Sequence, residues 1–165
     1  MDESSIRNLR IWFGTESGNA EMAAEDLAAE LGVDSGHVSD LHDLAPEDID
    51  RAALTIILCS TYGEGELPRG GRAFAERLRS AAGEAPLSGL RYLLMGLGDR
   101  SYAETYSRGA EHLDEALQAA GARRVGEIGR HDASGWDEVG ETAIAWAAEA
   151  LAGITANIET AGAPA

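Results

Sequence analysis

Small hydroxyl and glycine residues follow the first apolar run of the chain, and their types suit the binding of a phosphate. The segment consists of Thr15, Glu16, Ser17, Gly18, Asn19 and Ala20. Hydroxyl groups surround a tight turn, a glycine lets the backbone approach a ligand, and the predicted helix that follows points unpaired N–H groups at the same place. The segment can therefore hold a phosphate monoester through N–H and O–H donors alone. The alternative is an ordinary strand-to-helix turn with a hydroxyl cap.

Two later segments carry a tyrosine beside glycines and suit a flat aromatic ligand. They consist of Ser60, Thr61, Tyr62, Gly63, Glu64 and Gly65, and of Gly96, Leu97, Gly98, Asp99, Arg100, Ser101 and Tyr102. Tyrosines on neighbouring loops can hold a planar ring by offset stacking, and Gly63 permits its peptide to take two orientations. Each segment alone is compatible with a polar turn that has a tyrosine lid. The three segments contain neither a metal-ligand cluster nor a catalytic triad, so the indication comes from their combination.

The elements that position these segments are short apolar runs that alternate with amphipathic stretches, a pattern typical of a parallel sheet with crossover helices. Strands are predicted at 9–13, 37–41, 54–60, 90–97 and 123–128, helices at 20–31, around 74–78, at 107–120 and at 136–151, and a short helical turn at 45–48. We therefore predict an α/β fold with a doubly wound, five-stranded parallel sheet in three α/β/α layers. Its ligand is expected beyond the carboxyl ends of the strands. The domain is predicted to span 1–152, with a loosely held tail over 153–165.

The charge balance excludes several classes of function. The chain has 29 acidic and 13 basic residues, a net charge of −16, and no lysine. Such a surface disfavours binding to nucleic acid or to an anionic membrane. The absence of lysine excludes a nucleotide P-loop, Schiff-base chemistry and the phosphate-sensing lysine of receiver domains. A single cysteine, no apolar run long enough to span a bilayer and no signal peptide lead us to expect a cytoplasmic protein.

Taken together, the three loops resemble those of the flavodoxin family, including the flavodoxin-like FMN modules of diflavin reductases. The first loop resembles the phosphate loop of that family, and the two tyrosine loops resemble its two isoalloxazine loops. The resemblance implies that Tyr62 and Tyr102 flank the ring, that the Gly63 carbonyl meets flavin N5, and that backbone around Asp99 binds the pyrimidine end. It implies an FMN site made of Thr15, Glu16, Ser17, Gly18, Asn19, Ala20, Ser60, Thr61, Tyr62, Gly63, Gly65, Leu97, Gly98, Asp99 and Tyr102.

Three features refine the resemblance. Ala20 stands where many flavodoxins have threonine, as in diflavin modules and their small relatives, and this removes one hydroxyl donor from the phosphate loop. The fifth strand is predicted to be uninterrupted, as in the short-chain flavodoxins. Arg100 replaces a small residue beside the expected ring position, so it could reach the flavin edge or a partner.

The function implied by the resemblance is electron transfer by a monomeric carrier that is not itself an enzyme. Its partners would be an NAD(P)H-dependent flavin reductase and a basic-faced redox acceptor, such as a cytochrome monooxygenase or a biosynthetic redox enzyme. Two alternatives stay open: an FMN-dependent NAD(P)H:quinone reductase, and a binding module without a redox role. A ring of loop carboxylates would steer the basic partner. Its members are Glu64, Glu66, Asp99, Glu104 and Asp132.

Several residues outside the loops are interpreted as structural. Cys59 lies in an apolar run and is expected to be a buried, unreactive thiol. Trp12 and Trp146 are expected in the core. Trp136 is expected to pack at the start of the last helix, with exposed docking as the alternative. The four histidines have no metal-like spacing and are expected on the surface, although His131 could approach the flavin.

Overall fold

The fold is a parallel sheet covered on both faces by helices. A computed structural model describes residues 8–81, 85–101 and 104–162. The strands are β1 (Leu9–Gly14), β2 (Val38–Asp40), β3 (Leu54–Ser60), β4 (Arg91–Gly98), β5 (Arg123–Arg124) and β6 (Gly129–Asp132). The α-helices are α2 (Asn19–Leu31), α3 (Arg69–Ser80), α4 (Arg108–Ala119) and α5 (Val139–Gly162), and 3₁₀ turns are η1 (Ser35–His37), η2 (Leu41–Asp43) and η3 (Pro46–Asp48).

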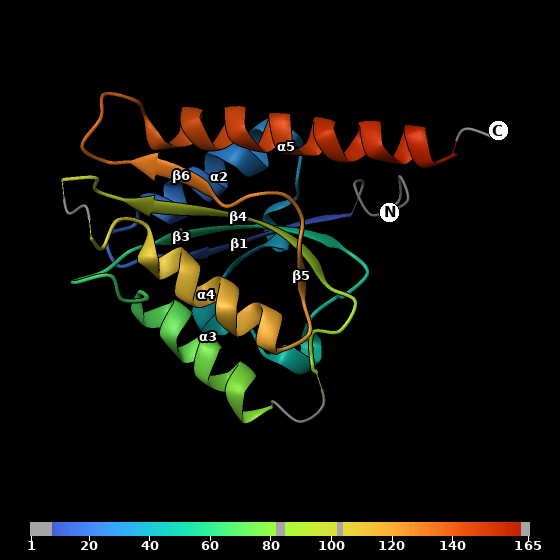
Figure 1. The fold of residues 1–165 in the computed structure, drawn as a ribbon, viewed down its shortest axis with the longest axis horizontal. Coiled ribbons are helices and arrows are strands. Elements are labelled where there is room, and N and C mark those ends of the chain that lie inside the picture. Colours follow the sequence, from blue (N-terminus) through green and yellow to red (C-terminus); the bar gives the residue numbers. More distant parts are fainter. Residues whose placement is uncertain (1–7, 82–84, 102–103, 163–165) are drawn as a thin grey trace.

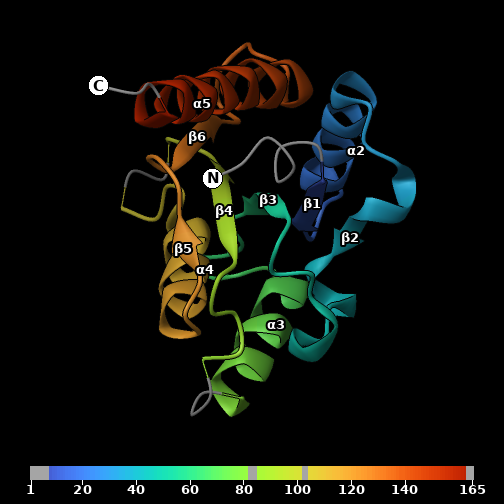
Figure 2. The ribbon, with the colours of Figure 1, turned by 90° about the vertical axis from the view of Figure 1, so that its right-hand side faces the viewer.

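The sheet has the strand order β2-β1-β3-β4-β5, and each of its pairings is parallel. Figures 1 and 2 show α2 and α5 on one face and α3 and α4 on the other. The order reverses direction between β1 and β3, since the chain passes from β1 to β2 on one side and then to β3 on the other. This confirms the predicted doubly wound, three-layer fold and places the loops after β1 and β3 at the switch point.

Two hydrophobic clusters fill the space between sheet and helices, one under each helical layer. Alternate residues of β3 serve them in turn, because side chains of a strand point to opposite faces: Ile56 and Leu58 pack under α2 and α5, whereas Ile57 and Cys59 pack under α3 and α4. The predicted core residue Trp12 lies in the second cluster, with its ring 5.9 Å from that of Phe74 in an edge-on contact. Burial on both faces explains why β3 reads as a continuous apolar run.

Helix α2 presents a stripe of small side chains to the sheet. Its buried residues include Ala20, Ala23, Ala24 and Leu27. The helix ends at Gly32, whose φ of 65° is left-handed and whose N–H bonds to the carbonyls of Ala28 and Ala29. The start and end of α2 agree closely with the prediction. The first turn of α2 follows the end of β1 after a short loop.

The predicted uninterrupted fifth strand is wrong. The edge of the sheet consists of two short strands, β5 and β6, which both pair with β4. Arg91 is opposite Arg123, whereas Met95 is opposite Gly129. The segment between β5 and β6 therefore contains two more residues than the facing stretch of β4. Gly126 lies in this segment with a φ of 75°. The two extra residues form a bulge in the edge strand. This bulge depends on how the strand pairs with β4, and the local pattern of hydrophobic residues does not indicate that pairing.

The predicted limits of the last helix are also wrong. Helix α5 begins at Val139 and ends at Gly162, well beyond the predicted end at Leu151. Ile154, which falls in the predicted loose tail, is buried in the cluster beneath α2 and α5. The segment is rich in alanine, glycine and threonine, so its composition did not indicate that Ile154 would be buried. Within the described residues, no helix is both long and apolar enough to cross a membrane.

Candidate functional site

The first predicted loop joins β1 to α2 and contains free hydrogen-bond donors. Gly18 precedes the helix with a φ of 88°, and its N–H donates to Thr15 Oγ1 over 2.9 Å. The helical hydrogen bonds begin with Met22 N–H to the Gly18 carbonyl. Within the described residues, the amides of the preceding positions 19–21 have no acceptor, as expected for a helix start without a side-chain cap.

Space above this loop is open. A Cβ atom built on Gly18 would meet no heavy atom within 4 Å, and the side chain of Ser17 is exposed. Free amides, two hydroxyl groups and the positive end of a helix therefore converge on an accessible position. The donor set fits a phosphate dianion, and none of its members is a cation.

Glu16 lies in the same loop, but its carboxylate serves another element. Its Oε1 accepts a hydrogen bond of 2.5 Å from the backbone N–H of Arg69, the first residue of α3. Helix α3 has Pro68 at its N-cap and no side-chain cap from within its own segment. Glu16 thus supplies that cap from the loop after β1. Its carboxylate accepts from the start of α3 and not from the free amides at the start of α2.

The second predicted loop is a closed turn after β3. Tyr62 and Glu66 exchange backbone hydrogen bonds of 2.9 and 2.8 Å, and Gly63 and Gly65 both have positive φ, 54° and 98°. Tyr62 projects with half of its surface exposed. The loop is tied to its neighbours because Thr61 N–H donates to the Leu97 carbonyl and Thr61 Oγ1 accepts from Gly109 N–H.

The third predicted loop follows β4 and is held by carboxylates. Asp99 accepts hydrogen bonds from the backbone N–H and the hydroxyl of Ser101. Asp132, at the end of β6, accepts from the backbone N–H of Arg100 over 2.9 Å and from the N–H and hydroxyl of Ser134. These hydrogen bonds, led by that of the Ser134 hydroxyl, hold the pKa of Asp132 below its ordinary value. Asp132 therefore joins the loops after β4 and β6.

The predicted site residues from 15 to 20, from 60 to 65 and from 97 to 99 lie at one edge of the sheet. In the strand register Gly14 is opposite Cys59, and Ser60 is opposite Leu97, so the three loops leave adjacent strands at the same level. Tyr102 lies outside the described residues. Arg100 is engaged in the protein itself, with its guanidinium 3.8 Å from Asp132 and over the ring of Tyr106 at 5.4 Å.

The start of α4 carries an unusual residue that the sequence analysis missed. Ser107 is buried, has a left-handed φ of 61°, and its hydroxyl has no hydrogen-bond partner within the described residues. It packs so closely on β4 that a Cβ on Gly96 or Gly98 would collide with it. The glycines of the Gly96–Gly98 segment are thus required by the approach of α4, in addition to any ligand.

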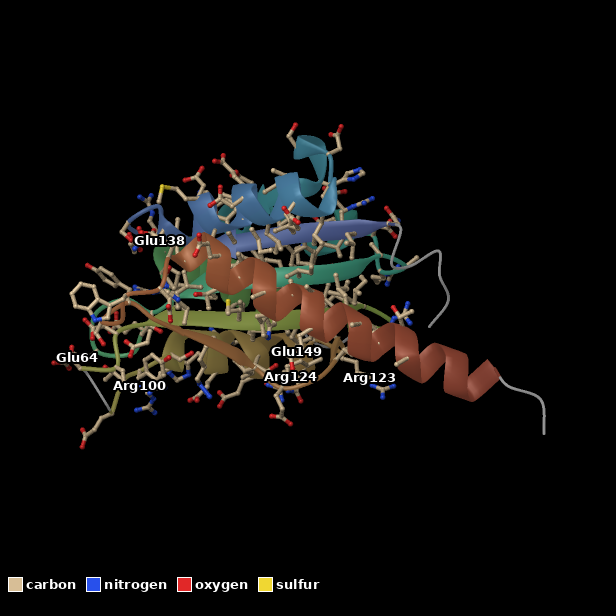
Figure 3. All side chains as sticks on the ribbon, turned by 90° about the horizontal axis from the view of Figure 1, so that it is seen from above. Glu64, Arg100, Arg123, Arg124, Glu138 and Glu149 are labelled. Carbon is tan, nitrogen blue, oxygen red and sulfur yellow. The ribbon has the colours of Figure 1, made fainter. Side chains whose placement is uncertain are left out.

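Two other predictions on this edge are wrong. Trp136 is fully exposed at 102%, so it does not pack at the start of α5. His131 is buried at 6% within β6, although surface placement was expected. Of the predicted acidic ring, Glu64, Glu66 and Glu104 are exposed and Asp99 and Asp132 are half-buried, and Figure 3 shows Glu64 and Glu138 at this same end of the molecule.

The interpretation of Cys59 as a buried thiol is confirmed. Its side chain is fully buried, and burial raises its pKa to about 12. In the part of the chain that the structure describes, no cluster of three or more histidine, cysteine or carboxylate side chains could hold a metal ion.

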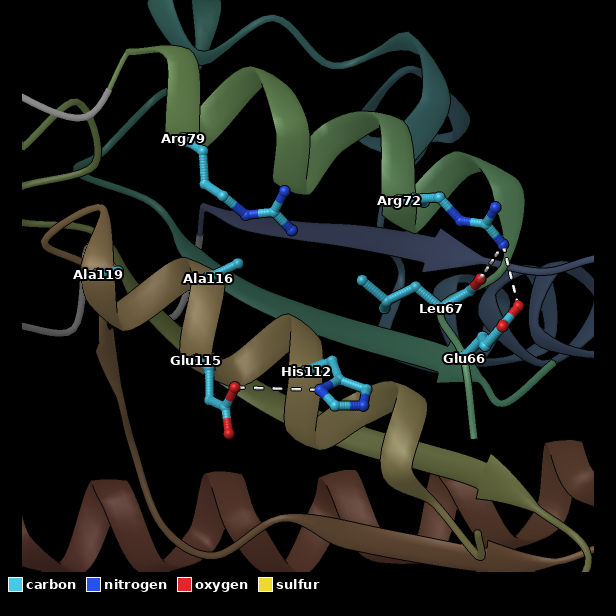
Figure 4. A pocket seen from close by; sticks show the side chains of 8 residues that line it. All are labelled: Glu66, Leu67, Arg72, Arg79, His112, Glu115, Ala116 and Ala119. Atoms are coloured by element: carbon cyan, nitrogen blue, oxygen red, sulfur yellow. Dashed lines mark hydrogen bonds and ion pairs between the residues drawn. The ribbon is translucent and has the colours of Figure 1, made fainter. Parts of the chain in front are cut away.

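A groove of about 540 Å³ lies beside the site, between α3 and α4 (Figure 4). Arg72 pairs with Glu66 over 3.4 Å at one end, and His112 pairs with Glu115 over 4.0 Å on the opposite wall. None of the predicted cofactor residues lines it. The groove mixes both signs of charge, and it borders the second loop at Glu66, which closes the turn after β3.

Comparisons with known proteins point to one family. Residues 11–146 match the sequence model described as flavodoxin. The chain is 33% identical over 159 residues to NADPH–cytochrome P450 reductase of Aspergillus oryzae, which covers 87% of this chain and 23% of the reductase. It is 33% identical over 127 residues to the sulfite reductase [NADPH] flavoprotein alpha-component of Thiocapsa roseopersicina, covering 75% and 24%.

The structural comparison agrees. The C101S mutant of flavodoxin from Pseudomonas aeruginosa superposes with a TM-score of 0.71 at 30% identity, over 87% of this chain and 97% of that one. By contrast, the chain spans less than a quarter of the two reductases named above.

Proposed function

The chain belongs to the flavodoxin family, and on that premise we propose that it binds FMN at the carboxyl edge of its sheet and carries single electrons between partner proteins. Flavodoxin-like modules bind FMN and transfer electrons, which gives the general function. The proposal concerns this chain's own cofactor site, its shuttling role and its partners.

The observation that carries the proposal is the set of free donors at the start of α2. The amides of 19–21 lack acceptors within the described residues, and the space above Gly18 is open. A phosphate bound there would receive hydrogen bonds from those amides and from the hydroxyls of Thr15 and Ser17. Because the chain has no lysine, arginine is the only permanently charged basic side chain that could assist, and the helix start and the neutral donors would stabilise the phosphate charge.

The remaining predicted residues would hold the ring. Tyr62 offers an exposed aromatic face, and the turn 62–66 keeps its backbone groups close to that face through its two closing hydrogen bonds. Gly63 has a positive φ, and a Cβ built on it would meet the Glu66 carboxylate at an ordinary contact distance of 3.8 Å. The conformational freedom of glycine would let its peptide change orientation. FMN, when bound, supplies reversible one- and two-electron redox chemistry. The protein binds and orients it and sets its electrostatic surroundings.

The proposed partners follow from charge and from the relatives. An NAD(P)H-dependent flavin reductase would deliver electrons, and a basic-faced acceptor would receive them. The relatives named above include a reductase of cytochrome P450 and a component of sulfite reductase, which supports a cytochrome monooxygenase or a biosynthetic redox enzyme as the acceptor. Exposed carboxylates such as Glu64 and Glu104 would steer the acceptor, so transfer should slow as salt rises.

The first test is FMN binding. Titration of the protein into FMN should quench flavin fluorescence, and Ser17→Ala should weaken binding by about 10- to 100-fold, since a hydrogen bond to a charged group contributes about 1.5–3 kcal/mol. Ser35→Ala, which changes an exposed serine of η1, should leave the Kd unchanged. No binding at micromolar FMN would refute the proposal.

The second test is electron transfer. The FMN-loaded protein should not oxidise NADPH by itself, and it should pass electrons to an acceptor once a separate NADPH-dependent flavin reductase is added. Rapid NADPH oxidation with a quinone by the protein alone would identify it instead as a quinone reductase.

A further inference from the structure

Exposed apolar surface is concentrated at the cofactor edge of the molecule. Within the described residues, the large hydrophobic side chains that are exposed are Met22 at 55%, Tyr62 at 50% and Trp136 at 102%. They belong to the first turn of α2, the loop after β3 and the loop after β6, which all begin at the carboxyl ends of strands. A single exposed apolar residue is ordinary, but three on one edge indicate a contact surface.

Trp136 is the most exposed of the three and lies outside both hydrophobic clusters. Its side chain is as accessible as in an extended peptide, and no ring contact with another described residue holds it. In the proposed function Tyr62 contacts the cofactor. Among the described residues, Trp136 is therefore an exposed aromatic side chain at this edge that is available to another molecule.

The loop that carries Trp136 is firmly attached at its base. Ala133 N–H donates to the Gly98 carbonyl over 2.8 Å, and Gly135 N–H donates to the Asp132 carbonyl over 3.0 Å. The Asp132 carboxylate adds the hydrogen bonds to Arg100 and Ser134. The indole is thus presented from a defined backbone next to the loop after β4, which lowers the ordering cost of binding.

Exposed carboxylates lie next to this position in the chain and at the same end of the molecule. Asp137 and Glu138 follow Trp136 directly and are exposed, and Glu64 lies at the same end of the molecule in Figure 3. Arg100, which Figure 3 labels at this end, is paired with Asp132. An aromatic anchor inside a charged rim is the arrangement found at the centres of protein interfaces, where tryptophan is enriched among the residues that dominate affinity.

We propose that Trp136 anchors a redox partner protein whose docking face has an apolar depression rimmed by lysine and arginine. This inference rests on the proposed function and adds the residue that holds the partner. The charge of the rim selects a basic protein, and the indole provides the desolvated contact.

The experiment is a calorimetric titration, at low ionic strength, of the FMN-loaded protein with an oxidised basic c-type cytochrome. Trp136→Ala should raise the Kd at least about fivefold, the usual threshold for a residue that matters at an interface, and Trp136→Phe should recover part of the loss. Glu138→Gln should also weaken binding, whereas Glu149→Gln, further along α5 in Figure 3, should not.

The FMN Kd of each variant separates the possible outcomes. An unchanged cytochrome Kd in Trp136→Ala, or no cytochrome binding by the unmodified protein, would overturn the inference and leave the proposed function intact. A loss of FMN affinity in Trp136→Ala would assign the indole to the cofactor and also overturn it. Failure of the unmodified protein to bind FMN would instead remove the proposed function.

Discussion

The Glu16 carboxylate accepts a hydrogen bond from the backbone N–H of Arg69, and this bond connects the loop after β1 to the first turn of α3. The two residues are distant in the sequence, and each belongs to a segment that borders the proposed FMN site. Glu16 completes the start of a helix that has no cap of its own, so the phosphate loop and the segment that ends the second loop are held together.

Glu16→Ala should lower the free energy of unfolding by about 1 kcal/mol, because α3 loses its cap. FMN binding should weaken several-fold at the same time, since the two loops lose their connection. Denaturant unfolding and flavin fluorescence titration measure the two effects. Glu16→Gln retains an acceptor oxygen and should recover most of both. If Glu16→Ala binds FMN as tightly as the unmodified protein, the residue is a helix cap only.

Ser107→Gly should stabilise the protein by about 1–2 kcal/mol. Glycine removes both the left-handed strain of a side-chain-bearing residue and a buried hydroxyl that has no partner within the described residues. Gly96→Ala should destabilise it, because the new Cβ collides with Ser107 Oγ, and the double variant should recover part of that loss. Thermal unfolding of the three variants provides the comparison. A destabilised Ser107→Gly would show that the hydroxyl has a partner.

Tyr92→Phe should cost about 1.5–3 kcal/mol, the usual contribution of a hydrogen bond to a charged group. The buried Tyr92 hydroxyl donates to Asp114 Oδ1 over 2.6 Å, and Asp114 also pairs with Arg124. Burial, together with the adjacent Asp114 carboxylate, raises the pKa of Tyr92, so the phenol stays protonated through the alkaline range. Denaturant unfolding at neutral pH tests the change. An unchanged midpoint would mean that Gln118 and Arg124 satisfy Asp114 alone.

Cys59 should resist thiol reagents in the folded protein. Burial raises its pKa to about 12, so almost no thiolate exists at pH 8, and the sulfur is out of contact with solvent. A colorimetric disulfide reagent should detect no thiol until denaturant is added, and then one per chain. Rapid labelling of the native protein would contradict the buried placement.

FMN affinity should fall in strong acid through Asp132. Hydrogen bonds to the carboxylate hold its pKa below its ordinary value in the folded protein, so the connection that it makes is complete above that ordinary value and is lost as the pH falls through the lowered pKa. Asp132→Ala should bind FMN more weakly at neutral pH and show less of this acid dependence. Asp137→Asn, which changes an exposed carboxylate of the same loop, is the control. Equal acid profiles for Asp132→Ala and the unmodified protein would contradict the assignment.

The sequence alone predicted the layered fold and the three loops, because these depend on local signals. An apolar run such as Leu54–Ser60 indicates a strand buried on both faces, and its predicted bounds agree with β3. Glycine and hydroxyl residues directly after such a run mark the edge where ligands bind, so the segment from Thr15 to Ala20 could be singled out without coordinates. Whether these residues bind FMN stays a prediction, and Tyr102 lies outside the described residues.

Only the tertiary structure decided which residues act on each other across the chain. The connection of Glu16 to Arg69, that of Asp132 to Arg100 and the packing of Ser107 on Gly96 all join separate elements. The split of the fifth strand likewise depends on pairing with β4. Such contacts leave no periodic trace, because hydrophobic patterning records whether a residue is buried and not what it touches. The exposure of Trp136 has the same origin: an aromatic residue at the start of a helix suggested packing, but no element among the described residues covers it.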